Sequence, residues 1–112
     1  MDREIINIYN SILENIPEKF YNDMYYKQGK DTIDFSDIVD VENFVKITSY
    51  ITVEITNDNE NYYINVDLCY NDSKIYKWLD KIYSLDFDYV RLKNKINWLI
   101  FDLIVNMYNN EY

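Results

Sequence analysis

Carboxylates are almost the only side chains in this 112-residue chain that could do chemistry. It contains twenty aspartates and glutamates, one cysteine, one glycine and no histidine. The commonest general base and metal ligand is therefore missing. Cys69 has no base partner in the pattern and is interpreted as a small strand residue, and a single glycine cannot build a phosphate-binding loop. We expect a protein that is not an enzyme.

The densest run of carboxylates is DTIDFSDIVDVE, where Asp31, Asp34, Asp37 and Asp40 recur at every third residue. This run lacks the alternating ligands, the turn glycine and the terminal glutamate of a calcium loop. Magnesium-dependent chemistry by paired aspartates is a minor alternative. The spacing places the four aspartates near one side of an irregular or 3₁₀-like stretch. We expect no metal and no cofactor.

The net charge of −9 is concentrated in the middle of the chain. Residues 31–72 carry ten acids and only Lys46, whereas residues 1–30 and 73–112 are close to neutral. A solvated acidic face that only serves solubility is the simplest explanation. Concentrating the charge costs self-repulsion, however, and such a surface steers basic partners and imitates a nucleic-acid backbone. We expect a basic protein partner and no direct contact with nucleic acid or membrane.

Residues 44–70 predict the element that carries much of this charge, a β-hairpin. Polar and apolar residues alternate in both halves, and a register in which paired residue numbers sum to 117 places the turn at Asp58–Asn59. The expected solvent face pairs Glu54 with Tyr63 and Tyr50 with Asp67, which makes it aromatic and acidic with almost no base. The inward positions are Val45, Ile47, Ile51, Val53, Ile55, Tyr62, Ile64, Val66 and Leu68.

The partner-binding surface predicted from these patterns joins the acidic run to the hairpin. Its tyrosines supply rigid aromatic area of the kind that anchors interfaces. The predicted residues are Asp31, Asp34, Asp37, Asp40, Glu42, Tyr50, Glu54, Asp58, Glu60, Tyr63 and Asp67.

Helices are expected on either side of the hairpin. Residues 2–15 have one apolar stripe at helical spacing, and a short helix follows Pro17. A short strand is expected at residues 31–36. Asn71–Asp72–Ser73 is interpreted as the cap of a helix that runs to about Tyr83, with Ile75, Trp78, Leu79 and Ile82 buried. The longest helix follows its cap at Asp86 and runs to about Tyr108.

The longest helix has two apolar faces, which leaves two interpretations. One face consists of Leu92, Ile96, Leu99, Ile100, Leu103 and Met107, and the other of Trp98, Phe101, Val105 and Tyr108. A helix that is apolar over most of its circumference is buried over most of it. We favour a central helix between the sheet and the first helix; the alternative is a homodimer through the Trp98, Phe101, Val105 and Tyr108 face.

The fold class expected is α+β, as a single domain over residues 1–112. It has an N-terminal helix, a two- or three-stranded antiparallel sheet, and two C-terminal helices packed on one sheet face. No apolar run is long enough to span a bilayer, and one cysteine excludes an internal disulfide. We expect a cytoplasmic protein. Abundant isoleucine, asparagine and tyrosine with no alanine are typical of an AT-rich genome, such as a low-GC bacterium or its phages.

In element order and charge, the chain resembles the small acidic anti-CRISPR inhibitors of phages and mobile elements. Some of these have a helix, a three-stranded antiparallel sheet and two helices, and block the DNA-binding site of the effector with acidic residues. The resemblance implies an anti-defence inhibitor that acts as a nucleic-acid mimic in a bacterial host. No sequence motif carries it, so it assigns no residue a role.

Two other functions fit the same sequence. An immunity protein or antitoxin that neutralises a basic nuclease toxin would have the same size and acidity. A small structural or assembly subunit would use the second apolar face of the longest helix.

Overall fold

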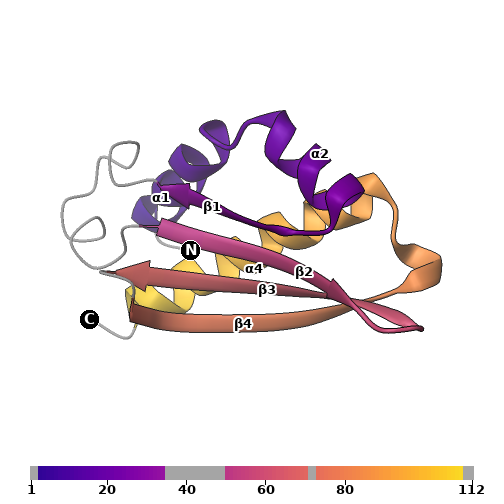
Figure 1. The fold of residues 1–112 in the computed structure, drawn as a ribbon. Coiled ribbons are helices and arrows are strands. Elements are labelled where there is room, and N and C mark those ends of the chain that lie inside the picture. Colours follow the sequence, from indigo (N-terminus) through magenta and orange to yellow (C-terminus); the bar gives the residue numbers. More distant parts are fainter. Residues whose placement is uncertain (1–2, 35–49, 71–72, 110–112) are drawn as a thin grey trace.

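A computed structural model describes residues 3–34, 50–70 and 73–109, without the side chains of residues 70, 73–76 and 108. Within these ranges, three helices and four strands make up an α+β fold (Figure 1). The helices are α1 (Arg3–Glu14), α2 (Glu18–Lys27) and α4 (Tyr89–Asn109). The strands are β1 (Lys30–Asp34), β2 (Tyr50–Asn57), β3 (Asn61–Tyr70) and β4 (Ser73–Tyr83), and a 3₁₀ turn, η1 (Ser84–Asp86), follows β4.

The four strands form one antiparallel sheet in the order β1-β2-β3-β4. The expected α+β class is confirmed, and so is the short strand that was expected within residues 31–36. The strand count of two or three is wrong, because the segment from Ser73 to Tyr83 is a strand and not a helix.

The segment that forms β4 fits both helical and strand periods, which explains the error. Trp78, Leu79 and Ile82 have helical spacing, but Trp78, Asp80 and Ile82 also alternate along one face of a strand. Isoleucine, tyrosine and tryptophan favour strands where a neighbouring strand is available. β3 provides that neighbour along the full length of β4, from the Tyr70–Ser73 pair to the Asn61–Tyr83 pair.

The hairpin of β2 and β3 was predicted with the correct faces and the wrong register. Paired residues sum to 119, as in Val53 with Val66, so the turn centres on Asn59 and Glu60. Both sums are odd, so the same residues face inward. The predicted inward residues that the structure describes are buried, except for the half-buried Tyr62, and positions 45 and 47 lie outside the described residues.

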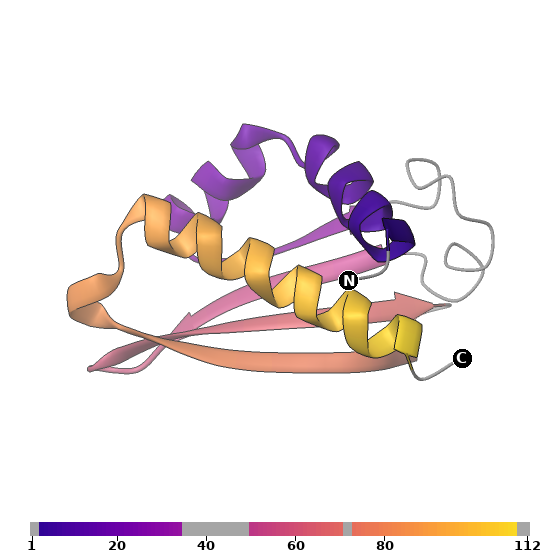
Figure 2. The same ribbon diagram turned by 180° about the vertical axis from the view of Figure 1, so that it is seen from behind.

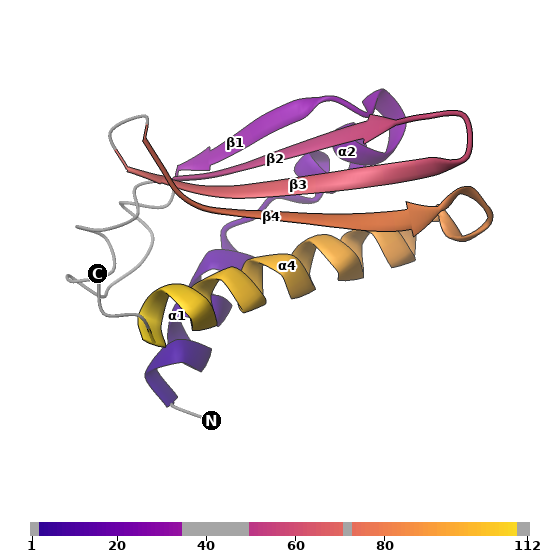
Figure 3. The ribbon, with the colours of Figure 1, turned by 90° about the horizontal axis from the view of Figure 1, so that it is seen from below.

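The three helices lie on one face of the sheet (Figures 2 and 3). α4 contacts β3 and β4 as well as α1 and α2, so it is the central helix that the sequence predicted. Its first apolar face is buried, with Leu92, Ile96 and Leu99 at 0 % exposure. Asp88 caps α4 instead of the expected Asp86, because its Oδ1 accepts a hydrogen bond from the Arg91 backbone N–H at 2.8 Å. None of the helices in the described ranges is long and apolar enough to cross a membrane.

A stack of aromatic rings connects the hairpin to the helical layer near the β2–β3 turn. Tyr62 of β3 stacks on Phe87, with ring centroids 3.7 Å apart, and Phe87 stacks on Tyr25 of α2 at 5.3 Å. Such pairs stabilise more than their buried area alone. The position of the turn is therefore fixed against both α2 and the segment that leads into α4.

Candidate acidic protein-binding surface

The predicted surface residues of β2 and β3 lie on the sheet face opposite the helices, because strand residues alternate between faces. The pairs differ from those expected. Glu54 is opposite Asn65, and Tyr63 is opposite Thr56. Tyr50 is opposite Cys69, which is buried in β3. The outer face therefore carries the predicted residues, but each of them is opposite a different residue from the one expected.

The described part of the hairpin carries no base, as expected, but the outer face of the whole sheet does. β1 and β4 flank the hairpin and add lysines to the same face. Lys30 is opposite Glu54, Lys77 is opposite Asp67, and Lys81 is opposite Tyr63. The sequence missed the last two because residues 73–83 were assigned to a helix, where their lysines would have pointed away from the sheet.

Part of the outer face is closed to solvent. The hydroxyl oxygens of Thr32 and Thr52, which are opposite each other on β1 and β2, lie 3.1 Å apart. Thr52 is in turn opposite Asp67 of β3, and Asp67 is opposite Lys77 of β4. Asp67 and Thr52 are each only 6 % exposed. Asp67 therefore belongs to the packed part of this face and offers a partner little of its surface.

The β2–β3 turn is exposed and carries a preorganised carboxylate. Asp58 accepts hydrogen bonds from the backbone N–H groups of Glu60 and Asn61, both at 2.8 Å, and from the Tyr63 hydroxyl at 2.9 Å. These bonds hold the pKa of Asp58 below its ordinary value, with the backbone donors first and Tyr63 next. The hydrogen bond to Asp58 in turn raises the pKa of Tyr63. The turn thus presents a fixed negative charge beside the exposed Glu60.

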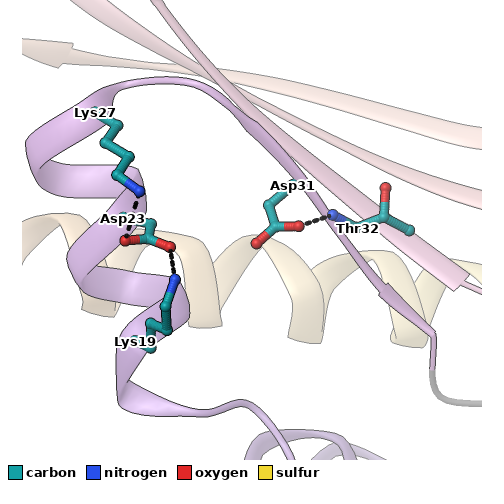
Figure 4. A network of polar contacts seen from close by, with 5 residues as sticks. All are labelled: Lys19, Asp23, Lys27, Asp31 and Thr32. Atoms are coloured by element: carbon teal, nitrogen blue, oxygen red, sulfur yellow. Dashed lines mark hydrogen bonds and ion pairs between the residues drawn. The ribbon is translucent and has the colours of Figure 1, made fainter.

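The aspartates of β1 do not share one side, which corrects the expectation drawn from their spacing. Residues three apart in a strand point to opposite faces. Asp31 is opposite the inward Val53, and Asp34 is opposite Tyr50. Asp31 accepts a hydrogen bond from the Thr32 backbone N–H at 2.8 Å (Figure 4). Predicted residues Asp37, Asp40 and Glu42 lie outside the described residues.

Two acids of the helical layer, Asp23 and Glu18, are neutralised by nearby bases. The carboxylate of Asp23 forms ion pairs with two lysines of α2 (Figure 4). The Lys19 Nζ lies 2.5 Å from its Oδ2, and the Lys27 Nζ lies 3.5 Å from its Oδ1. Glu18 accepts hydrogen bonds from the Tyr89 hydroxyl and from Lys93, and these bonds lower its pKa in that order. The Tyr89 bond also raises the pKa of that tyrosine to about 12.

The same holds where α4 meets β4 and η1. Lys95 of α4 pairs with Asp80 of β4 at 2.9 Å. Arg91 lies 3.4 Å from Asp88 and 3.8 Å from Asp86. The Lys95–Asp80 pair links α4 to β4, and the Arg91–Asp86 pair links α4 to η1.

The acids of the hairpin are different. Within the described ranges, Glu54, Asp58 and Glu60 form no ion pair, and neither does Asp31 of β1. We call Glu54, Asp58, Glu60 and the neighbouring Tyr63 the hairpin surface. It is the part of the predicted surface on the hairpin that is accessible and forms no ion pair with a described residue, although Lys30 lies opposite Glu54 on the flanking strand.

Other chemistry is not evident in the described ranges, which contain no cluster of three or more acidic or cysteine side chains able to hold a metal ion. The second apolar face of α4 is mixed: Trp98 is 49 % exposed, whereas Phe101 packs edge-on against Tyr9 of α1 at 4.9 Å. The side chain of Tyr108 lies outside the described set. The predicted homodimer through this face stays a prediction.

Comparisons of the sequence with protein-family models and with characterised proteins, and of the fold with solved structures, find no match.

Proposed function

We propose that this protein is a non-enzymatic inhibitor that binds a basic, nucleic-acid-handling protein through the hairpin surface. It would act as an anti-CRISPR or other anti-defence protein of a phage or mobile element and take the place of nucleic acid on its target. The observation that carries this proposal is the set of carboxylates at Glu54, Asp58 and Glu60. They lie together on one hairpin and form no ion pair with any described residue.

Electrostatics supports the hairpin as the binding element. β2, β3 and their turn carry four acids and no base within residues 50–70. Uncompensated charge of one sign attracts an oppositely charged partner and accelerates association. Neutralised acids, such as Asp23 between Lys19 and Lys27, contribute little to such a field.

Preorganisation supports the turn as the centre of the contact. A carboxylate already held by two backbone N–H groups and by Tyr63 loses little freedom when a lysine or arginine of a partner approaches. The lowered pKa of Asp58 keeps it ionised well below neutral pH. Tyr63 adds aromatic area beside it.

A pulldown from the lysate of an AT-rich bacterium tests the proposal, with a triple variant Glu54→Gln, Asp58→Asn and Glu60→Gln beside the wild type. The matched control is Glu4→Gln, Glu14→Gln and Asp102→Asn, which changes the net charge equally but on the helices. We expect wild type and control to capture a basic nucleic-acid enzyme, the triple variant to lose it, and high salt to release it.

A second step decides between partner classes. DNA or RNA substrate is titrated against the captured complex. Competition between nucleic acid and this protein supports the mimic. Capture of a toxin whose nucleic-acid site stays open favours an immunity protein, and capture that survives both the triple variant and high salt contradicts the hairpin surface.

A further inference from the structure

The second edge of the sheet, formed by β4, has properties opposite to those of the hairpin. β4 is eleven residues long and lies at the end of the strand order, so among the described strands it has a neighbour on one side only. Figure 3 shows β4 along the border of the sheet, above α4. An edge strand presents a row of backbone N–H and C=O groups that can pair with another chain.

Exposed apolar side chains gather around this edge. Seven large hydrophobic residues of the described ranges are exposed, and five of them fall between residues 79 and 98. Leu79 and Tyr83 lie on the outer face of β4, at 57 % and 59 % exposure, and Leu85 in η1 is 97 % exposed. Trp98 of α4, at 49 % exposure, lines the same cavity as Tyr83. Val90 at the start of α4 is 63 % exposed. This concentration is the usual mark of an interaction site.

A groove runs along the inner side of the same edge. A cavity of about 390 Å³ lies between the end of β4, η1 and α4, and its apolar part includes Ile82, Tyr83 and Trp98. A second cavity of about 330 Å³ shares Asn94 and Trp98 with the first and extends to Tyr9 and Phe101. Trp98 therefore lies between the two cavities, and the first of them is the groove beside β4.

The charges around this edge are mainly positive. Lys77 and Lys81 flank Leu79 on the outer face, and Lys81 lies over the Tyr83 ring, 4.8 Å from its centroid. Arg91 and Lys95 line the groove, with Asp86 as the one carboxylate of its lining, and Lys95 also pairs with Asp80 of β4 at 2.9 Å. Arg91 is 64 % exposed and its carboxylate partners lie at 3.4 and 3.8 Å, so these ion pairs are weak and can be replaced.

We propose that β4 is a strand-addition site for an extended acidic segment of another protein. The segment would pair with the free edge of β4 and present alternate side chains to the two faces. Acidic residues would lie opposite Lys77 and Lys81, and apolar or aromatic residues would enter the groove beside Trp98. Main-chain bonds supply the affinity in this mode, and the pockets for alternate side chains supply the specificity.

Charge decides between this occupant and a second copy of the chain. A second β4 would bring its own lysines to the same edge, and lysines on an edge strand oppose pairing with an identical strand. An acidic segment meets opposite charges on both faces. The inference does not rest on the proposed function, since the hairpin surface and the β4 edge involve different residues and partners of opposite charge.

The experiment titrates the isotope-labelled protein with a short peptide that alternates glutamate and valine and carries one central tyrosine. Amide hydrogen exchange and the indole N–H resonance of Trp98, which is distinct from that of Trp78, are recorded by NMR. We expect protection of β4 amides that point away from β3, a shift of the Trp98 indole resonance, and weakening by salt. The same peptide with lysine in place of glutamate is the ligand control, and it should not bind this edge.

Two protein variants sharpen the result. Lys77→Gln with Lys81→Gln should weaken peptide binding roughly fivefold, the effect of losing two cross-strand charge pairs. Lys19→Gln with Lys27→Gln makes the same charge change on α2 and should leave binding unaltered. Unchanged exchange of the β4 amides, or equal binding of the lysine peptide, overturns the proposal. A protein mass that doubles with concentration while β4 becomes protected also overturns it, in favour of a second copy.

Discussion

Two neighbouring parts of one sheet differ most in this molecule: the β2–β3 hairpin and strand β4. Residues 50–70 carry four acids and no base, whereas residues 73–83 carry three lysines and one aspartate. β4 is hydrogen-bonded to β3 of the hairpin. Few of their charged residues lie opposite one another, and the pair of Asp67 with Lys77 is one that does. The sheet is therefore polarised in charge, and a net charge of −9 for the whole chain conceals a basic edge.

The difference indicates that charged side chains make different kinds of contact in different parts of the chain. In the helical layer, ion pairs such as Glu18 with Lys93 join elements that are distant in sequence. At the β2–β3 turn, hydrogen bonds orient a carboxylate toward solvent instead. These hydrogen bonds stabilise the turn and leave the carboxylate without an ion-pair partner among the described residues.

The largest expected effect comes from a substitution in the core that both parts share. Ile64 of β3 is fully buried, with 0 % exposure, so Ile64→Ala removes buried methyl groups and leaves a cavity. We expect a loss of about 3 kcal/mol in the free energy of unfolding, measured by urea denaturation. Leu79→Ala on β4, 57 % exposed, is the control and should change stability by less than about 0.5 kcal/mol. Equal losses would mean that the outer side of β4 is packed.

A smaller effect is expected from the single aspartate of β4. Partial burial acts to raise the pKa of Asp80, but hydrogen bonds from Lys95 and from the Lys81 backbone N–H outweigh it, so the pKa is lowered. Asp80→Asn should cost about 1 kcal/mol near neutral pH, a value reduced for the partial exposure of both side chains. Asp86→Asn, where the ion pair is longer and more exposed, is the control.

The pH dependence of this substitution has a definite sign. A lowered folded-state pKa stabilises the protein above the ordinary pKa, and the contribution is lost as pH falls through the lowered value. The difference between wild type and Asp80→Asn should therefore shrink below about pH 4. A difference that grows toward acid pH would contradict the ion pair with Lys95.

The smallest effect concerns the turn. Tyr63→Phe removes one of three hydrogen bonds to Asp58, so the pKa of Asp58 should rise part of the way toward its ordinary value while the fold persists. Carboxyl-carbon NMR during a pH titration measures this change. Tyr83→Phe is a matched control that should leave Asp58 unaltered. No change in the Tyr63 variant would mean that the backbone donors alone set the pKa.

Sequence patterns predicted most of the elements because their periods are unambiguous. The apolar stripe of α1, the alternation of β2 and β3, and the long buried face of α4 each fit only one kind of element. In residues 73–83 the same apolar residues satisfy two periods, and the choice is made by pairing with β3. That information is tertiary, so the local pattern does not contain it.

The candidate surface was predicted less completely for the same reason. Glu54, Asp58 and Tyr63 were identified from charge and alternation, and they lie together on the hairpin. The lysines of β4 were missed on this face, and the burial of Asp67 was not expected. Both depend on which strands flank the hairpin. One pattern in the sequence does fit a strand. Lys77, Leu79, Lys81 and Tyr83 stand at every second position, so a strand places them on one face.

The most direct test of the polarised sheet is one NMR experiment with two probes on the wild-type protein. A short lysine-rich peptide and the glutamate–valine peptide are titrated separately, and amide shifts are followed along the sheet. The account predicts that the lysine-rich peptide shifts Glu54, Asp58, Glu60 and Tyr63, while the acidic peptide shifts residues 77–83. Shifts by both peptides at the same residues, or by the lysine-rich peptide at β4 alone, would contradict it.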